Sequence, residues 1–167
     1  MRRRLSYWHP ASLIATGFGI GNAPIASGSW ASLAVLPVAW LIAERFGSLW
    51  LIAAATVALL AGLWASARYC LASGEKDPSR IVIDEIAGQF LALAPIATPD
   101  PVLYGIGFFV FRIFDIAKVW PASYFDRRHG ATGIMVDDII AGAYANIVSH
   151  LIWLGLSWLL PVAGFLE

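Results

Sequence analysis

The stretch IVIDEIAGQFLAL, residues 81–93, places Asp84 and Glu85 inside an otherwise apolar segment. Two later apolar stretches repeat this pattern, FRIFDIAK at residues 111–118 and GIMVDDIIAGAYA at residues 133–145. An unpaired carboxylate in apolar surroundings costs several kcal/mol or takes up a proton. The acidic residues of the three stretches therefore need a shared counter-charge, and a bound divalent metal is an efficient way to hold several carboxylates together.

The composition of the chain indicates an integral membrane protein. Of its 167 residues, 59% are hydrophobic and 13% are charged, and the mean hydropathy is +0.73. Soluble domains have about 25% charged residues and about 45–50% apolar residues. The length predicts a single membrane-embedded domain over residues 1–167. The net charge of zero gives no reason to expect a nucleic-acid partner, no sequence feature indicates a protein partner, and the single cysteine excludes an internal disulfide.

The hydropathy pattern predicts an all-α, polytopic helical bundle with about five apolar helices. The run of 19 uncharged residues at 49–67 is long enough to cross about 30 Å of hydrocarbon. Two polar loops, 73–80 and 120–136, separate the later helices, and we expect Asp126 and the Arg127–His129 run to be solvated. The expected helices cover residues 30–43, 49–67, 81–97, 101–119 and 137–160.

A glycine-rich segment precedes the first long helix. Residues 10–32 predict a short helix, a loop and a new helix start near Ser29, because several glycines and Pro24 argue against a continuous helix. Such a loop can present backbone N–H groups to an anion, or it can serve only as a hinge. The candidate substrate-binding residues of this loop are Thr16, Gly17, Gly19, Ser27, Gly28 and Ser29.

The distribution of basic residues predicts the topology. With the N-terminus in the cytoplasm, five alternating helices place all of the 11 Lys and Arg residues except Arg45 on the inside. The same topology brings the three acidic stretches and the glycine-rich loop to the cytoplasmic face. Arg112 lies about 16 Å into its helix, so its side chain should point into the bundle rather than to lipid. Arg112, Asp115 and Lys118 share one helix face.

These residue types suit phosphate chemistry. Carboxylates hold Mg²⁺, which bridges to phosphate oxygens, while Arg112 and Lys118 can bind the remaining oxygens. At the mouth of a membrane bundle, the reaction that this favours is metal-assisted hydrolysis of a phosphomonoester on a membrane phospholipid. Two other functions remain open: a small cation transporter whose acids bind ions, and a membrane assembly subunit with structural ion pairs between helices.

Four motifs in order resemble the bacterial phosphatidylglycerophosphatase A family: TGFGIGNAPIASGSWASL, IVIDEIAGQF, FRIFDIAKVWP and GIMVDDIIAG. The resemblance covers about residues 14–145. The chain departs from the family pattern at Ser27-Gly28-Ser29, where members often have Pro-Gly-Thr, at Ala31, where they often have glycine, and at Val119, where they often have proline.

The resemblance implies a multi-pass enzyme of the bacterial inner membrane with its active site facing the cytoplasm. It implies Mg²⁺-dependent removal of the terminal phosphate of phosphatidylglycerophosphate, which leaves phosphatidylglycerol. By motif match, Arg112 and Lys118 are expected to bind substrate. The catalytic residues are expected to be Asp84, Glu85, Asp115 and Asp138. The metal ligands are expected to be Asp84, Glu85, Asp115, Asp137 and Asp138.

Overall fold

The computed structural model describes residues 5–94, 96 and 99–159, with the side chains of 157–159 left out. Every regular element in these residues is helical, which confirms the all-α prediction. The last predicted helix continues past 159 into residues outside the described ones. The elements are α1 (Pro10–Ala15), the 3₁₀ helix η1 (Ile20–Asn22), α2 (Ser27–Phe46), α3 (Trp50–Ser73), α4 (Ile83–Leu93), α5 (Pro101–Ala117), α6 (Ala122–Asp126) and α7 (Ala131–Leu159).

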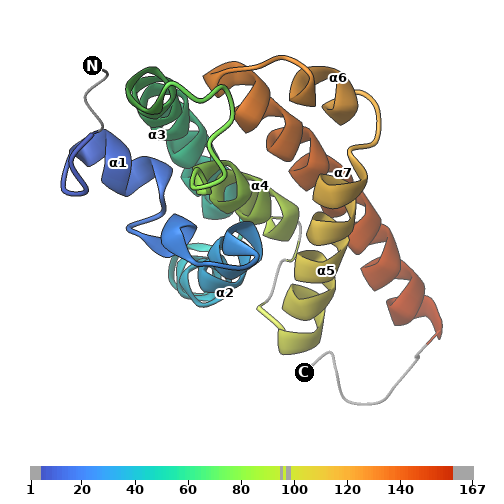
Figure 1. Cartoon of the computed structure of the whole chain (residues 1–167). Helices are drawn as coiled ribbons and strands as arrows, with labels where there is room; N and C mark the ends of the chain where they lie inside the picture. The colour runs from blue at the N-terminus through green and yellow to red at the C-terminus, as the bar shows by residue number, and fades with distance from the viewer. Residues whose placement is uncertain (1–4, 95, 97–98, 160–167) are drawn as a thin grey trace.

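Helix α4 lies at the centre of the bundle, in contact with α2, α3, α5 and α7 (Figure 1). Four consecutive residues, Ala87 to Phe90, are buried, so α4 is covered on all sides. Its crossing with α7 is a contact between backbones. A Cβ on Gly142 would lie 2.4 Å from the carbonyl oxygen of Gly88, so only glycine fits at this position without a shift.

Within the described residues, three helices are long and apolar enough to cross a membrane: α2, α3 and α7. Their outward faces carry large apolar side chains such as Leu41, Val57 and Leu151, which suit contact with lipid. Helix α4, with 11 residues, and α5, with 17, are shorter. The prediction of about five membrane-spanning helices is therefore not confirmed. An apolar run of 81–97 does not by itself distinguish a helix buried by protein from one that crosses lipid.

The N-terminal segment follows the predicted order of short helix, loop and new helix. The loop places Gly17 and Gly19 at φ of 54° and 100°, a region that glycine enters without strain. Helix α2 then begins at Ser27, two residues before the predicted start. The end of α1 is joined to the start of α4, because the backbone N–H of Val82, the residue before α4, donates to the carbonyl oxygen of Ala15.

The prediction of one long polar loop at 120–136 is wrong. Residues 122–126 form α6, and α7 begins at Ala131 instead of near Asp137. The connection is tight: a Cβ on Gly133 would lie 1.5 Å from the carbonyl oxygen of Arg128. Glycine at this position lets the first turn of α7 lie against the end of α6. Asp137 and Asp138 consequently lie in the second turn of α7, not at its start.

Candidate active site

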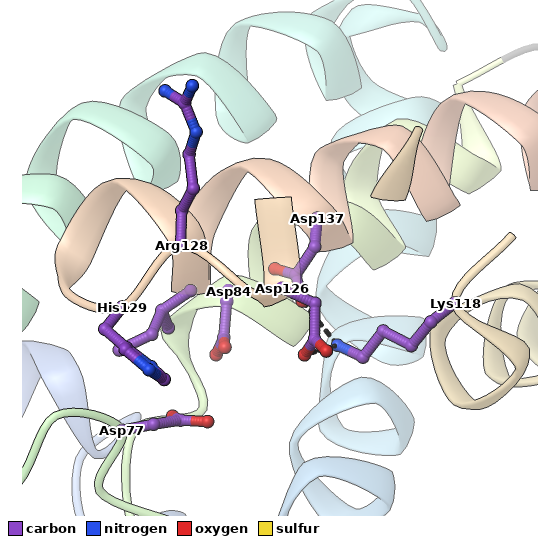
Figure 2. Close-up of a pocket in the computed structure, with 8 residues that line it drawn as sticks. Asp77, Asp84, Lys118, Asp126, Arg128, His129 and Asp137 are labelled. Carbon is purple, nitrogen blue, oxygen red and sulfur yellow. Dashed lines mark hydrogen bonds and ion pairs between the residues drawn. The ribbon is translucent and has the colours of Figure 1, made fainter. Parts of the chain in front are cut away.

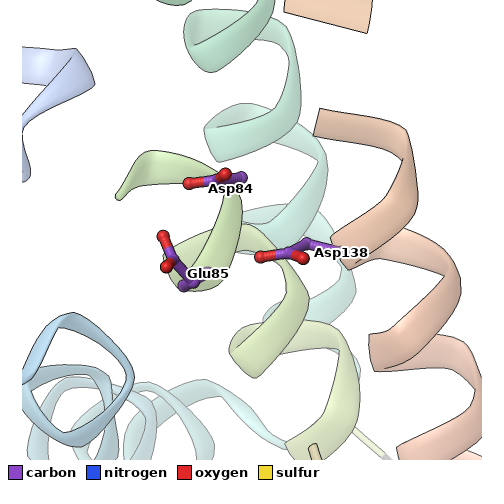
Figure 3. A group of neighbouring side chains, drawn as sticks. All are labelled: Asp84, Glu85 and Asp138. Atoms are coloured by element: carbon purple, nitrogen blue, oxygen red, sulfur yellow. The ribbon is translucent and has the colours of Figure 1, made fainter. Parts of the chain in front are cut away.

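Three helices bring the acidic residues to the same end of the bundle. Asp84 and Glu85 lie in the first turn of α4, and Asp138 projects from α7 toward them (Figure 3). Asp137 precedes Asp138 on α7, and Asp115 lies near the end of α5. The antiparallel course of α5 relative to α4 and α7 places its C-terminal turns beside their N-terminal turns. Residues from three separate stretches of sequence thus form one cluster.

Asp84, Glu85 and Asp138 form the part of this cluster that we call the open triad. Each offers a carboxylate oxygen within 4.8 Å of those of the other two. Asp84 Oδ1 and Glu85 Oε2 are buried atoms without a hydrogen-bond partner among the described residues. Buried oxygens of this kind carry a desolvation cost that a bound cation or donor would offset.

Lys118 provides the counter-charge for the other acids of the cluster. Its Nζ donates a hydrogen bond to Asp137 Oδ2 and lies 3.4 Å from Asp126 Oδ1. It is further away from Asp115 and Asp138, at 3.8 and 3.9 Å. Lys118 is the residue that ends α5, with φ of 48°, and this backbone conformation directs the chain away from the helix axis. One ammonium group is thereby shared by four carboxylates.

Arg112 and Asp115 form the second ion pair of the site. The Nη1 atom of Arg112 lies 2.6 Å from Asp115 Oδ2, and 16% of the arginine side chain is exposed. The inward orientation of Arg112 and its shared helix face with Asp115 and Lys118 are as predicted. The Nε atom of Arg112 has no hydrogen-bond partner in the described part of the chain, so the guanidinium retains donor capacity for a ligand.

The protonation equilibria of the site follow from burial and neighbouring charge. Burial raises the pKa of Asp84 well above its usual range, and the carboxylates of Glu85 and Asp138 raise it further. Burial lowers the pKa of Lys118, but its hydrogen bond to Asp137 and the charges of Asp138 and Asp137 outweigh that effect, so its pKa is raised overall. The surroundings of Lys118 therefore favour its charged form, while those of Asp84 disfavour its charged form.

A small polar cavity of about 50 Å³ adjoins the cluster (Figure 2). Asp84 and Asp137 face it from the bundle, and Lys118 reaches it from the end of α5. Its outer wall comes from the loop before α4, from the last residue of α6 and from the segment between α6 and α7. That wall consists of Asp77, Asp126, Arg128 and His129.

The glycine-rich loop touches the cluster at a single described glycine, Gly28. A Cβ at this position would lie 1.8 Å from Glu85 Oε1, so the carboxylate occupies the space that any side chain would need. Ser27 Oγ donates to the carbonyl oxygen of Ser79, which ties the start of α2 to the loop before α4. Ser29 lines an apolar groove on the outside of α2. Among the described residues predicted to form the loop, Gly28, which lies in the first turn of α2, therefore has the direct contact with a carboxylate of the site.

Thr16, Gly17 and Gly19 have contacts that maintain the loop itself. Thr16 Oγ1 donates to the carbonyl oxygen of Ser12 and accepts from the N–H of Gly19. Gly17 packs against the apolar side chains of Val82 and Ile86. These contacts do not bring the three residues to the carboxylates, and their role in substrate binding stays a prediction.

Sequence reasoning missed three groups beside the site. Asp126 and the Arg127–His129 run are exposed, as predicted, but Asp126 is also an ion-pair partner of Lys118, and Arg128 and His129 also line the cavity. The three residues lie close to Asp137 in sequence, but this closeness indicates a place at the site only if residues 122–126 fold back against α7. Gln89 is fully buried one turn after Glu85, with both amide atoms lacking partners in the described structure.

The fold and the site together define a class. The chain is an all-helical, membrane-associated protein with a half-buried cluster of carboxylates and cations at one end of its bundle. This class includes membrane enzymes that act on phosphorylated lipids and carriers of ions.

Comparison with known proteins decides between these. The family described as phosphatidylglycerophosphatase A matches residues 13–153. The chain belongs to this family and is a phosphatase. No solved structure matches the chain.

Individual relatives support the assignment. Phosphatidylglycerophosphatase A of Escherichia coli strain K12 is 34% identical over 152 residues, which are 90% of this chain and 88% of the relative. The Haemophilus influenzae protein of the same name is 33% identical over 147 residues, 87% of this chain and 90% of the relative. A Bacteroides thetaiotaomicron protein, provisionally named phosphatidylinositol-3-phosphatase, is 36% identical over 142 residues, 81% of this chain and 89% of the relative.

Proposed function

We propose that this protein removes the terminal phosphate of phosphatidylglycerophosphate in a Mg²⁺-dependent reaction, as a step in phosphatidylglycerol synthesis. The observation that carries the proposal is the open triad. Its three carboxylates lie within 4.8 Å of one another, and neither Asp84 nor Glu85 has an ion-pair partner within 4 Å in the described residues. The names of the family and of two relatives supply the substrate.

The donor set fits magnesium. Mg²⁺ prefers oxygen ligands and is held in proteins by a few carboxylates while phosphate supplies further oxygens. Asp84, Glu85 and Asp138 would hold the ion, and the buried oxygens without partners on Asp84 and Glu85 are the atoms that gain most from it. When bound, Mg²⁺ supplies positive charge to the phosphate oxygens and acts as a Lewis acid toward the phosphoryl group. Asp115 and Asp137, also predicted ligands, already have cationic partners.

The cationic side chains of the site have separate tasks in this proposal. Arg112 is held in place by Asp115 and keeps an unpartnered Nε, so its guanidinium can donate to phosphate oxygens. Lys118 balances the charge of Asp137 and its neighbours and sits at the cavity, where it can also approach a phosphate. The predicted substrate-binding role of Lys118 is thereby combined with a role in organising the acids.

The location of the site supports a topology in the bacterial inner membrane. The cluster lies where α2 and α4 begin and where α5 ends, so it occupies one end of the bundle. Arg80 and Arg128 flank this end, whereas Arg45 lies in the last turn of α2, about 30 Å along that helix. Under the positive-inside rule, the site faces the cytoplasm and the whole chain acts as one membrane-embedded domain.

One assay tests the proposal. The purified protein in detergent is offered phosphatidylglycerophosphate, and released phosphate is measured with Mg²⁺ and with a chelator. We expect release that needs Mg²⁺ and is lost in Asp84→Asn. Phosphatidylinositol 3-phosphate, offered in parallel because of the name of the third relative, should be hydrolysed more slowly. A folded protein that releases no phosphate from either lipid would return the cluster to the ion-carrier or structural alternatives.

A further inference from the structure

An apolar groove runs along the outside of the bundle between α2 and α5. The turn before α2 contributes Ile25 and Ala26, α2 contributes Trp30 and Leu33, and α5 contributes Phe108. Ile25 is 78% exposed and Trp30 is 56% exposed, so the groove is open on its outer side. No described charged residue lines it. A groove of this composition suits an apolar, chain-like ligand better than a polar one.

The α2 wall of the groove leads to the open triad. Ser29 and Trp30, which line the groove, directly follow Gly28 in the first turn of α2. The backbone of Gly28 lies against the carboxylate of Glu85, with no room even for a Cβ between them. Only the backbone of this turn therefore separates the apolar surface from an acid of the site.

The α5 wall leads to the same place. Phe108, Arg112 and Asp115 are spaced i, i+4 and i+7, so they form a continuous stripe along one face of α5. The stripe passes from the apolar groove to a guanidinium and then to a carboxylate that is ion-paired with it. Both walls thus change from apolar to charged in the same direction.

Polar atoms at the charged end of the groove lack partners. Glu85 Oε2 and Arg112 Nε are buried without a hydrogen-bond partner in the described part of the chain. One of these residues adjoins each wall, Glu85 at α2 and Arg112 at α5. A ligand that fits this arrangement has an apolar tail and a phosphate at one end. The phosphate oxygens would accept a hydrogen bond from Arg112 and bind a cation held at Glu85. A second copy of the chain or a partner helix would cover the groove but would not need this polar end.

We propose that the groove between α2 and α5 binds one acyl chain of the phospholipid substrate while the headgroup phosphate lies at Glu85 and Arg112. This proposal rests on the proposed lipid phosphatase function and names the route by which the substrate enters the site from the bilayer. The lipid can stay anchored in the membrane, because the groove is open along its length and only the headgroup has to leave the interface. Leu33 and Phe108 are then specificity residues for the acyl chain, not catalytic residues.

Kinetics with two substrates test the proposal. Leu33→Trp should fill the groove and raise the KM for dioleoyl phosphatidylglycerophosphate about tenfold, with little change in kcat. The same variant should leave kcat/KM for a dibutyryl analogue, whose chains are too short to fill the groove, within about twofold. Leu41→Trp is the matched control, because Leu41 is 56% exposed on the same helix and outside the groove. Equal losses with both substrates, or unchanged KM for the dioleoyl lipid, would overturn the proposal.

A measurement without turnover separates this proposal from the proposed function. A phosphatidyl lipid with a photoactivatable diazirine at mid-chain is incorporated with the wild-type protein into nanodiscs, irradiated, and the labelled residues are mapped by mass spectrometry. We expect labelling concentrated at residues 25–33 and 108, with less at Leu41. Uniform labelling of the outward faces of α2, α3 and α7 would show a general lipid surface and refute the groove. If labelling is concentrated there but no phosphate is released, the groove stands and the phosphatase proposal fails.

Discussion

The acids of this site fall into two groups that differ in what balances their charge. Asp115 and Asp137 have direct cationic partners, Arg112 and Lys118. In the open triad, Asp84 and Glu85 have no such partner in the described structure, and Asp138 has Lys118 only at 3.9 Å. Both groups lie in similar surroundings, so burial alone does not explain the difference. The fold thus neutralises one part of the cluster with its own side chains and leaves the other part for an added cation.

The largest effect should come from neutralising the open triad. Asp84→Asn or Asp138→Asn should lower kcat on the order of 10³-fold, because the loss of a metal ligand removes several kcal/mol of transition-state stabilisation. Without Mg²⁺, the melting temperature in detergent should equal or exceed that of the wild type, because an uncompensated acid is gone. Phosphate release measures the expected loss of activity, and thermal melting measures the expected stability without Mg²⁺. Activity within about tenfold of the wild type would place the metal elsewhere.

Magnesium itself should stabilise the native protein through the same residues. At a free concentration of about 100 times its Kd, a ligand that binds only the native state adds about 2.7 kcal/mol to the free energy of unfolding. We therefore expect the melting temperature to rise with Mg²⁺ in the wild type and to stay constant in Asp84→Asn. Asp100→Asn is the control, because Asp100 caps the distant end of α5 and should leave the Mg²⁺ response intact. An equal rise in Asp84→Asn would disconnect the triad from metal binding.

Loss of a charge from the paired group, in contrast, should lower the stability of the protein. Lys118→Met removes the cation shared by Asp137 and its neighbours and should destabilise the protein by about 2 kcal/mol, between the values for exposed and buried ion pairs. Adding Asp137→Asn should restore part of this loss, since one carboxylate no longer lacks a partner. Denaturation of the two single variants and the double variant measures the coupling. Additive effects would mean that the ion pair contributes nothing to stability.

The smallest of these effects concerns the position of Glu85. Gly28→Ala introduces a Cβ into the space of the Glu85 carboxylate and should lower kcat about tenfold by displacing that ligand. Gly105→Ala is the matched control, because a Cβ there meets no atom within 4 Å and alanine favours the helix. Equal activity in both variants would show that Glu85 can move without cost to the reaction.

Much of this architecture could be predicted from local sequence. The helices α2 and α3 follow from uninterrupted apolar runs, and the inward orientation of Arg112 follows from the cost of a charge facing lipid. The meeting of Asp84 with Asp138 follows from the placement of acids in helices that alternate in direction. These inferences rest on hydrophobic periodicity and on the positions of charged residues, both of which can be read directly from the sequence.

The remainder depends on contacts between distant residues. The fold-back of α6 onto α7, which brings Asp126 to Lys118, depends on a backbone approach at Gly133. The division of the acids into paired and open groups depends on the conformation of Lys118 at the end of α5. The link from Gly28 to Glu85 joins helices that are more than fifty residues apart. No local sequence pattern shows that residues 122–126 fold onto α7 instead of forming a solvated loop, or that Gly28 contacts Glu85 instead of serving as a hinge.

The glycine crossing of α4 and α7 has a consequence for the tolerance of the protein to change. Asp84 precedes Gly88 by four residues, and Asp138 precedes Gly142 by four, so each acid sits one helical turn from the point where the two backbones touch. The separation of these acids is thus determined by a contact between main-chain atoms, which glycine at both positions permits. A substitution on the lipid-facing surface of α7 should therefore leave the spacing of the two acids unchanged, whereas a side chain at Gly142 should change it.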